Sequence, residues 1–320
     1  MSKSTPRVAV ITRTKNRPVF LSRAIKSVLD QTYQDFVHVI LNDGGDKAAV
    51  DRVLSDNLDS RRIVIHNDSS VGLAAALNQA IKASKSDLIS IHDDDDAWHP
   101  ERLEAGLASI DERRAEANVV SMEIVVEDVD PDGKPVELER MPHPESWSGE
   151  ISLYKQAHRN YLSNGAVMYS RRLYDELGGY DETLPTAEDW DFGIRLMMIC
   201  DVEQVFSEHA LVYYHQRPDV KDPEVGNSVH AGVREQERTI MKLRNRYLRD
   251  DLQKGVFGVG FIMNDVEQSL INLVRLERHV NGATSSLKGD LRSTEETITR
   301  DIRKSSLYRL AKERLSKLHH

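Results

Sequence analysis

Cysteine is nearly absent from this sequence, since Cys200 is the only one among 320 residues. A disulfide within the chain is therefore excluded, and a reducing compartment is expected. Long apolar runs are also missing, because no stretch approaches the roughly 18 residues of a membrane-spanning helix. The polar residues 1–7 lack the apolar core of a signal peptide. We therefore expect a soluble cytoplasmic protein, with peripheral contact to the inner membrane face left open.

Basic charge is scarce relative to acidic charge, with 43 Lys and Arg residues against 52 Asp and Glu residues and a net charge of -9. No global positive field attracts a phosphate backbone, so nucleic acid is not expected as the main partner. A length of 320 residues is enough for one large α/β domain with an appendage, or for two domains.

Short apolar runs alternate with segments of helical periodicity over residues 8–126. The strands are expected over 8–11, 36–41, 63–65, 88–91 and 119–126, with helices over 18–28, 48–58, 73–83 and 100–116. This alternation predicts an α/β fold with a mostly parallel, Rossmann-like sheet flanked by helices. The less regular residues 136–165 are interpreted as a substrate-binding excursion. Farther along we expect a strand over 166–169, helices over 171–177 and 188–200, and a strand pair over 202–206 and 210–214.

The C-terminal part changes character and carries helical periodicity without a strand signal. We therefore expect a domain over residues 1–235 and a helical extension over 236–320. Residues 262–280 form a heptad-like seam, which favours either a homo-oligomer through residues 260–320 or a helix packed on its own domain. Residues 293–318 are rich in Lys and Arg and suit either an anionic membrane surface or a solvated helix.

Four consecutive aspartates, Asp93 to Asp96, follow the expected strand 88–91. Adjacent carboxylates repel one another, so such a run is costly unless a cation binds it or water solvates it. The carboxyl end of a strand is where open α/β sheets bind their ligands. Carboxylate oxygens suit Mg2+ or Mn2+ bridged to substrate phosphates. The working hypothesis is a divalent ion on a phosphorylated substrate.

These segments resemble family 2 glycosyltransferases of the GT-A fold, which use nucleotide sugars. The resemblance covers residues 7–230 and rests on segments in the expected order: residues 10–18 (VITRTKNRP), 27–33 (SVLDQTY), 42–45 (NDGG), 92–100 (HDDDDAWHP), 178–182 (GGYDE) with 188–191 (EDWD), and 213–217 (YYHQR) with 226–228 (GNS). Each segment alone is a weak signal. Their order makes the resemblance specific.

The resemblance implies an inverting, metal-dependent glycosyl transfer. Asp93 and Asp95 correspond to the family's DxD pair and are expected to bind Mn2+ or Mg2+, although the four aspartates leave the register open. His215 is implied as a further ligand; the alternative is a histidine buried between strands. Asp189 matches the catalytic base, with Glu188 as its competitor. Acids at a helix start also need no catalytic explanation, because the helix dipole favours them there.

The same resemblance and the local chemistry suggest donor-binding and acceptor-binding residues. Basic loop residues suit phosphate, a strand-end acid suits a nucleobase, and an Arg fork suits a diphosphate. The expected donor-binding residues are Thr12, Arg13, Arg17, Asp43, Asp93, Asp94, Asn164, Arg217 and Ser228, and Trp190 and Asp191 are expected near the acceptor. Trp98 and Trp147 are further candidates for stacking on a sugar or base.

The resemblance thus implies an enzyme that moves a sugar, with a UDP-sugar favoured as donor, to a hydroxyl of a glycan or lipid-linked glycan in surface-polysaccharide biosynthesis, as in O-antigen assembly. A nucleotidyltransferase is one alternative, but residues 12–18 lack the glycine that its basic loop would carry. A non-catalytic sugar-nucleotide-binding protein is the other, and the presence of Asp93, Asp95, Asp189 and His215 disfavours it.

Overall fold

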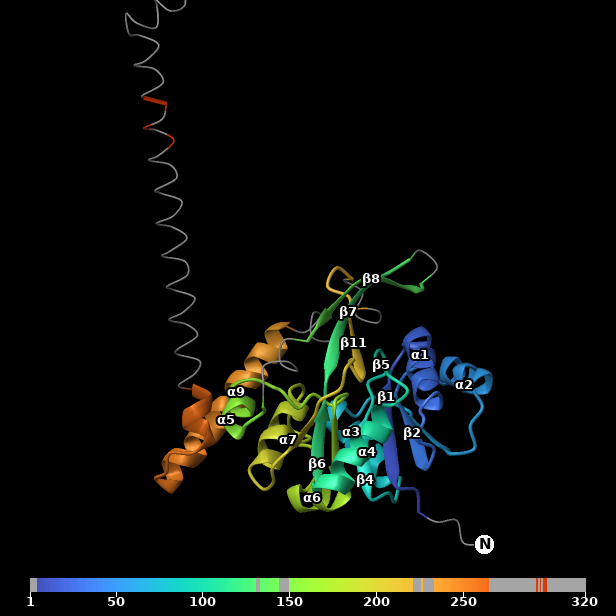
Figure 1. The fold of residues 1–320 in the computed structure, drawn as a ribbon, viewed down its shortest axis with the longest axis horizontal. Helices are drawn as coiled ribbons and strands as arrows, with labels where there is room; N and C mark the ends of the chain where they lie inside the picture. The colour runs from blue at the N-terminus through green and yellow to red at the C-terminus, as the bar shows by residue number, and fades with distance from the viewer. Residues whose placement is uncertain are drawn as a thin grey trace, which may run out of the picture. The chain divides into compact units, whose positions relative to one another are not determined.

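The computed structural model describes residues 5–130, 133–143, 150–220, 226, 233–264, 292, 294, 296 and 297 (Figure 1). The first half of the chain alternates strands and helices. Its elements are β1 (Val8–Thr14), α1 (Pro18–Leu29), β2 (Phe36–Asp43), α2 (Lys47–Asp56), β3 (Arg62–Asn67), α3 (Leu73–Lys82), β4 (Leu88–Ile91), β5 (Ala97–Trp98), α4 (Arg102–Arg113), β6 (Ala117–Val120), β7 (Met122–Val129) and β8 (Pro135–Pro142).

Shorter elements follow in the second half. They are α5 (Leu153–His158), β9 (Val167–Ser170), α6 (Arg171–Leu177), α7 (Glu188–Met197), β10 (Glu203–Val205), β11 (Val212–Gln216) and α9 (Val233–Lys254). Local chemistry sets several boundaries. Pro18 lies in the first turn of α1, where its missing N–H is no loss. The Asp46 carboxylate caps α2, and Gly178 ends α6 in the left-handed conformation at φ 74°.

The large sheet has the strand order β10-β6-β9-β4-β1-β2-β3 within the described residues. Its strands run parallel except for β9, which pairs antiparallel with both β4 and β6. The side chains of β2 alternate between two faces. Ile40 packs with residues of α1 and α2, while Val39 and Leu41 belong to the cluster that contains α3. The prediction of a mostly parallel sheet flanked by helices is confirmed.

The small sheet has the order β5-β11-β7-β8 in the described part of the chain. Its strand β11 pairs parallel with β7 and antiparallel with β5. Since β5 begins directly after the aspartate run, this sheet brings the late strand β11 beside the end of β4. The β7–β8 pairing shifts register between Val126 and Glu127, a local irregularity of the kind that often re-aims a side chain.

Two expected strand assignments were wrong. Residues 119–126 are not one strand, because β6 joins the large sheet and β7 joins the small sheet, with Ser121 between them. Residues 202–206 and 210–214 do not form a strand pair either, since β10 pairs with β6 whereas β11 pairs with β5 and β7. A local apolar pattern indicates that a segment is extended, but the partner strand comes from elsewhere in the chain.

Helix α9 packs on α5 and α7 through a second apolar cluster. Leu243 of α9 is buried with Ala157 of α5 and with Trp190 and Ile194 of α7, and Figure 1 shows the three helices together, away from α1 and α2. By their contacts, residues 1–263 group as one compact unit. The expected division between residues 235 and 236 rested on a change of composition and stays a prediction. Most of residues 260–320, expected to mediate oligomer formation, lie outside the described residues.

Candidate active site

Four parallel strands deliver their polar loops to one edge of the large sheet. In the pairing, Ile11 of β1 lies opposite Ile91 of β4, and Asp43 of β2 lies opposite Asn67 of β3. The loops also lock together. A Cβ on Gly45 would approach the Asn16 backbone nitrogen to 2.8 Å, so only glycine fits between the loops after β1 and β2.

The aspartate run after β4 is largely buried, and its members have different partners. Asp96 accepts a 2.9 Å hydrogen bond from the backbone N–H of His215, which ties the run to β11. Asp94 lies 3.5 Å from the Arg17 guanidinium, and Arg17 also donates to Asp95 Oδ2 at 3.3 Å. Burial, followed by the charge of Asp95, raises the pKa of Asp94. The structure thus assigns Asp96 an anchoring contact and gives Asp94 and Asp95 a shared cationic neighbour.

Asp95 belongs to a buried charge network. Arg217, whose side chain is fully buried, donates to both Asp95 Oδ2 and Glu127 Oε1. Arg23 donates to Glu127 Oε2 at 2.7 Å and to the main-chain oxygen of Asp95. Sequence reasoning missed Arg23 and Glu127, because one lies within an amphipathic helix and the other in a strand without any motif. The guanidinium of Arg217, expected to bind phosphate, is paired here with the carboxylates of Asp95 and Glu127.

The acids Asp93 and Asp189 lie within electrostatic reach of each other. Burial raises the pKa of Asp93 to about 7, and the charges of Asp95, Asp94 and Asp189 act in the same direction. The charge of Arg13 opposes this rise in the pKa of Asp93, and it also partly offsets the rise in the pKa of Glu188. The Arg13 guanidinium therefore lies near enough to both acidic segments for its charge to act on them.

Helix α7 begins with the acid pair Glu188 and Asp189. Ala187, just before it, has a left-handed backbone at φ 60°, a conformation that costs a non-glycine residue about 1 kcal/mol. Asp189 accepts hydrogen bonds from Asn160 Nδ2 and from the Trp190 backbone N–H, both at 2.8 Å. Burial raises the pKa of Asp189, and it raises the pKa of Glu188 to about 8 with help from the Asp189 charge. Asn160 is a further residue that sequence reasoning missed.

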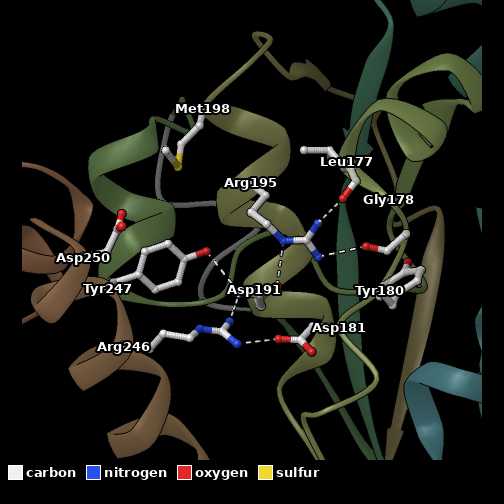
Figure 2. A pocket seen from close by; sticks show the side chains of 11 residues that line it. Leu177, Gly178, Tyr180, Asp181, Asp191, Arg195, Met198, Arg246, Tyr247 and Asp250 are labelled. Atoms are coloured by element: carbon white, nitrogen blue, oxygen red, sulfur yellow. Dashed lines mark hydrogen bonds and ion pairs between the residues drawn. The ribbon is translucent and has the colours of Figure 1, made fainter. Parts of the chain in front are cut away.

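Trp190 and Asp191 turn away from Asp189. The Trp190 ring is buried with α5 and α9, and its indole N–H donates to the Gln156 oxygen at 2.6 Å. Asp191 accepts from Arg195 and Arg246, each at 2.7 Å, and from Tyr247 at 3.1 Å. Asp191, Arg195, Arg246 and Tyr247 line a cavity of about 520 Å³ between α7 and α9, and Figure 2 shows their side chains side by side. The lining of this cavity includes none of Asp93–Asp96 or Asp189.

The expected base-recognition and nucleotide residues are buried and hydrogen-bonded within the protein. The Asp43 carboxylate accepts from Ser70 Oγ at 2.7 Å and from the backbone N–H groups of Val71 and Gly72. Desolvation opposes these bonds, but together they lower the pKa of Asp43. Thr12 is fully buried, and its hydroxyl contacts His38 Nε2 at 2.9 Å. Asp43 therefore fixes the loop after β3, and its part in donor binding stays a prediction.

Asn164 and Gly165 lie beside the aspartate run. Asn164 accepts from the Tyr180 hydroxyl at 2.9 Å, and a Cβ on Gly165 would come within 3.7 Å of Asp96 Oδ2. Trp98 donates to the Gly165 oxygen at 3.1 Å and is buried, as a core residue would be. Ser228 and Trp147, also expected near the donor, lie outside the described residues.

The donor atoms available for a divalent ion are carboxylate oxygens, whose crowding suits a hard cation. His215 is neutral, because burial and the charges of Arg23 and Arg217 lower its pKa to about 2. However, Asp93, Asp95 and His215 do not offer three ligand atoms within 4.8 Å of one another; among the described residues, only His99, Glu101 and His209 do so. The carboxylates fit a cation that takes its other ligands from phosphate and water, whereas His215 as third ligand stays a prediction.

Comparison with known proteins agrees with this architecture. Residues 9–178 match the family described as glycosyl transferase family 2. The chain belongs to that family, and glycosyltransferase activity follows in place of the nucleotidyltransferase and non-catalytic alternatives. WcaA of Escherichia coli (strain K12), provisionally named as a colanic acid biosynthesis glycosyl transferase, is 29% identical over 61% of this chain and 68% of its own. YwdF of Bacillus subtilis (strain 168), an uncharacterized glycosyltransferase, is 25% identical over 69% of this chain and 79% of its own.

Solved structures of GT-A glycosyltransferases share the fold. TarS residues 1–349 of S. aureus, in complex with UDP-GlcNAc, superpose with a TM-score of 0.54 at 20% identity, covering 66% of this chain and 59% of that one. The mannosyltransferase PcManGT of Pyrobaculum calidifontis, in complex with GDP-Man and Mn2+, gives a TM-score of 0.56 at 16% identity over 89% and 81% of the two chains. The predicted GT-A fold is confirmed. Within the described residues, no helix combines the length and apolarity needed to cross a membrane.

Proposed function

We propose that this glycosyltransferase is inverting and dependent on Mn2+ or Mg2+, and that it moves a sugar from a nucleoside diphosphate to a hydroxyl of a glycan or lipid-linked glycan. The observation that carries the proposal is the electrostatic proximity of Asp93, in the run after β4, to Asp189 at the start of α7. One acidic segment suits a cation and a diphosphate. The other suits a hydroxyl that must lose a proton.

The donor side comprises the aspartate run and its basic neighbours. Asp93 and Asp95 would hold the divalent ion, which would neutralise the negative charge that develops on the departing diphosphate. Arg13 would face the phosphates from the end of β1. Arg17 donates to the main-chain oxygen of Gly226 at 2.8 Å. It thereby joins the loop after β1 to the segment 226–228, which we propose covers the donor. Asp94, Asn164, Arg217 and Ser228 would complete the donor site, with Thr12 and Asp43 supporting its nucleotide end.

The acceptor side centres on Asp189. The acceptor hydroxyl would attack the anomeric carbon opposite the diphosphate, forming a carbon–oxygen bond as the bond to phosphate breaks, and Asp189 would take the hydroxyl proton. Its raised pKa makes it a stronger base than an exposed aspartate, and Asn160 fixes its orientation. Glu188 is less suited, because a pKa of about 8 leaves it mostly protonated at neutral pH. Trp190 and Asp191 would shape the acceptor side indirectly.

The first experiment identifies the nucleotide sugar that serves as donor. TarS and the Pyrobaculum mannosyltransferase were solved with UDP-GlcNAc and GDP-Man respectively, so both nucleotides belong in the test, and UDP-sugars come first. Melting temperatures of the full chain would be measured with UDP-, GDP- and dTDP-sugars, each with Mn2+ or with EDTA, because a ligand that binds the native state raises the melting temperature.

The donor that stabilises the protein only with Mn2+ would then be incubated with glycan and lipid-linked acceptors. The anomeric configuration of the product would be read by NMR. A product of inverted configuration is expected. Retention of configuration would contradict the single-displacement mechanism, and full turnover in EDTA would contradict the dependence on a metal ion.

A further inference from the structure

A cluster of two histidines and a glutamate lies beside the small sheet, outside the site described above. We call His99, Glu101 and His209 the imidazole cluster. Their ligand atoms all lie within 4.8 Å of one another. His209 Nε2 is 3.4 Å from Glu101 Oε2, and the two imidazole rings have centroids 4.0 Å apart at an angle of 43°. Three side chains from two distant segments thus place one ligand atom each within 4.8 Å of the other two.

The backbone around the imidazole cluster is fixed by contacts that do not involve its side chains. Trp98 lies opposite Val212 in the antiparallel β5–β11 pair, and the His99 N–H donates to the Leu211 oxygen at 3.0 Å. On the other segment, the Ser121 hydroxyl donates to the His209 oxygen at 3.3 Å. These contacts hold the backbone at His99 and His209 in place without an ion.

The donor types indicate which cation would bind. Imidazole nitrogen with a single carboxylate suits Zn2+ and other late first-row transition metals, whereas Mg2+ and Mn2+ prefer sites made of oxygen. In a tetrahedral zinc site with bonds of about 2.0–2.1 Å, neighbouring ligand atoms are about 3.3 Å apart. The distance of 3.4 Å between His209 and Glu101 already matches that spacing. His99 offers a ring nitrogen within 4.8 Å of the ligand atoms of both residues.

We propose that the imidazole cluster is a zinc site with His99, Glu101 and His209 as protein ligands and water in the remaining position. The site is separate from the aspartate run, which binds hard cations in the proposed function. Binding through His99 Nδ1 would replace the 3.3 Å hydrogen bond that this atom accepts from the Glu101 N–H. Zinc would cross-link the end of β5 to the segment before β11. Asp96 directly precedes β5, and His215 lies within β11.

The test measures zinc bound by the full-length protein after treatment with EDTA and removal of the chelator. Zinc would be titrated against a chromogenic chelator in excess Mg2+, which occupies carboxylate sites without competing for imidazole. One tightly bound zinc per chain is expected, together with a rise in melting temperature. The His99→Gln/His209→Gln variant should lose both effects. If the wild type binds no zinc, or the double variant binds as much as the wild type, the proposal is wrong.

Control variants separate the imidazole cluster from other zinc-binding groups. His66 forms a 3.1 Å contact with Asp51 and is a histidine–carboxylate pair without a second imidazole, so His66→Gln should keep the bound zinc. The variants His319→Ala/His320→Ala and Asp95→Asn should keep it as well. Glu101→Gln changes a half-exposed side chain and tests the site without disturbing the fold; zinc binding equal to that of the wild type in this variant would remove Glu101 as a ligand and overturn the three-residue site. Asp95→Asn alters the proposed donor site and leaves all three residues of the imidazole cluster in place, so loss of glycosyl transfer with zinc still bound would show that the two sites are independent.

Discussion

Arg217 donates a hydrogen bond to Asp95, although the two residues are 122 positions apart in the chain. The guanidinium is fully buried and has Glu127 as its other partner, so Arg217 links the aspartate run to strand β7. The charge of Asp95 is thereby compensated without a metal ion. Removing one partner of such a buried ion pair destabilises the folded protein, because the other charge stays buried without compensation.

Asp95→Asn should abolish metal-dependent turnover of the nucleotide sugar, because it removes a proposed metal ligand and keeps the shape of the side chain. Transfer rates would be measured against Mn2+ concentration. The exposed Asp56→Asn variant should behave as the wild type does, since Asp56 lies at the end of α2. Circular dichroism would establish that both variants are folded. Unchanged activity in a folded Asp95→Asn protein would remove Asp95 from the metal site.

Asp189→Asn should leave donor binding nearly intact and lower kcat by about 10²–10⁴-fold, which is the usual contribution of a general base. Donor affinity would be measured by calorimetry, and kcat by product formation. Glu188→Gln serves as the comparison, because Glu188 is already mostly protonated at neutral pH. If Glu188→Gln loses the larger share of kcat, the two acids exchange roles.

Asn160→Ala should shift the acidic limb of the kcat–pH profile to higher pH. The hydrogen bond from Asn160 lowers the pKa of Asp189, against the effect of burial, so its loss raises that pKa further. A higher pKa means that the base is deprotonated only at higher pH. The profile would be recorded with saturating donor and acceptor. A limb that stays in place, with only a general loss of rate, would indicate a purely structural role for Asn160.

The free energy of unfolding should fall as pH rises from about 6.5 to 8 in the absence of divalent ions. Burial raises the pKa of Glu188 to about 8, so the folded state holds a proton that the unfolded state has released, and stability decreases with pH until the folded carboxyl ionises. The depressed histidines act in the opposite direction, but their effect is complete above their ordinary value of 6.5. Urea unfolding at several pH values would measure the slope, and Glu188→Gln should reduce it; the buried Asp93, whose pKa is raised to about 7, contributes to the remaining slope.

Arg246→Met should destabilise the protein by about 1–2 kcal/mol, because Arg246 joins α9 to Asp191 of α7 and to Asp181 in the segment before α7. The half-exposed guanidinium keeps this loss modest, while the methionine retains much of the apolar stem. Arg238→Met, an exposed position on the same helix, is the matched control. Equal urea midpoints for the two variants would show that the contact to Asp191 contributes little.

The sequence by itself determined the strand–helix alternation, the aspartate run at the end of β4 and the acid pair at the start of α7. These features are local, since periodicity and strand-end polarity depend on neighbouring residues alone. The family resemblance rested on the same local segments. It therefore extended to Asp93, Asp95 and Asp189 but not to Glu127 or Asn160, which lie in no recognisable motif.

Tertiary structure alone decided which distant segments meet. The apolar run over residues 119–126 divides between two sheets because β6 finds β9 and β10, whereas β7 finds β8 and β11. The same pairing brings Arg217 to Asp95 and His209 to His99, contacts that no spacing in the sequence encodes. Buried charges must find partners wherever the chain supplies them, and strand pairing determines which partners come within reach.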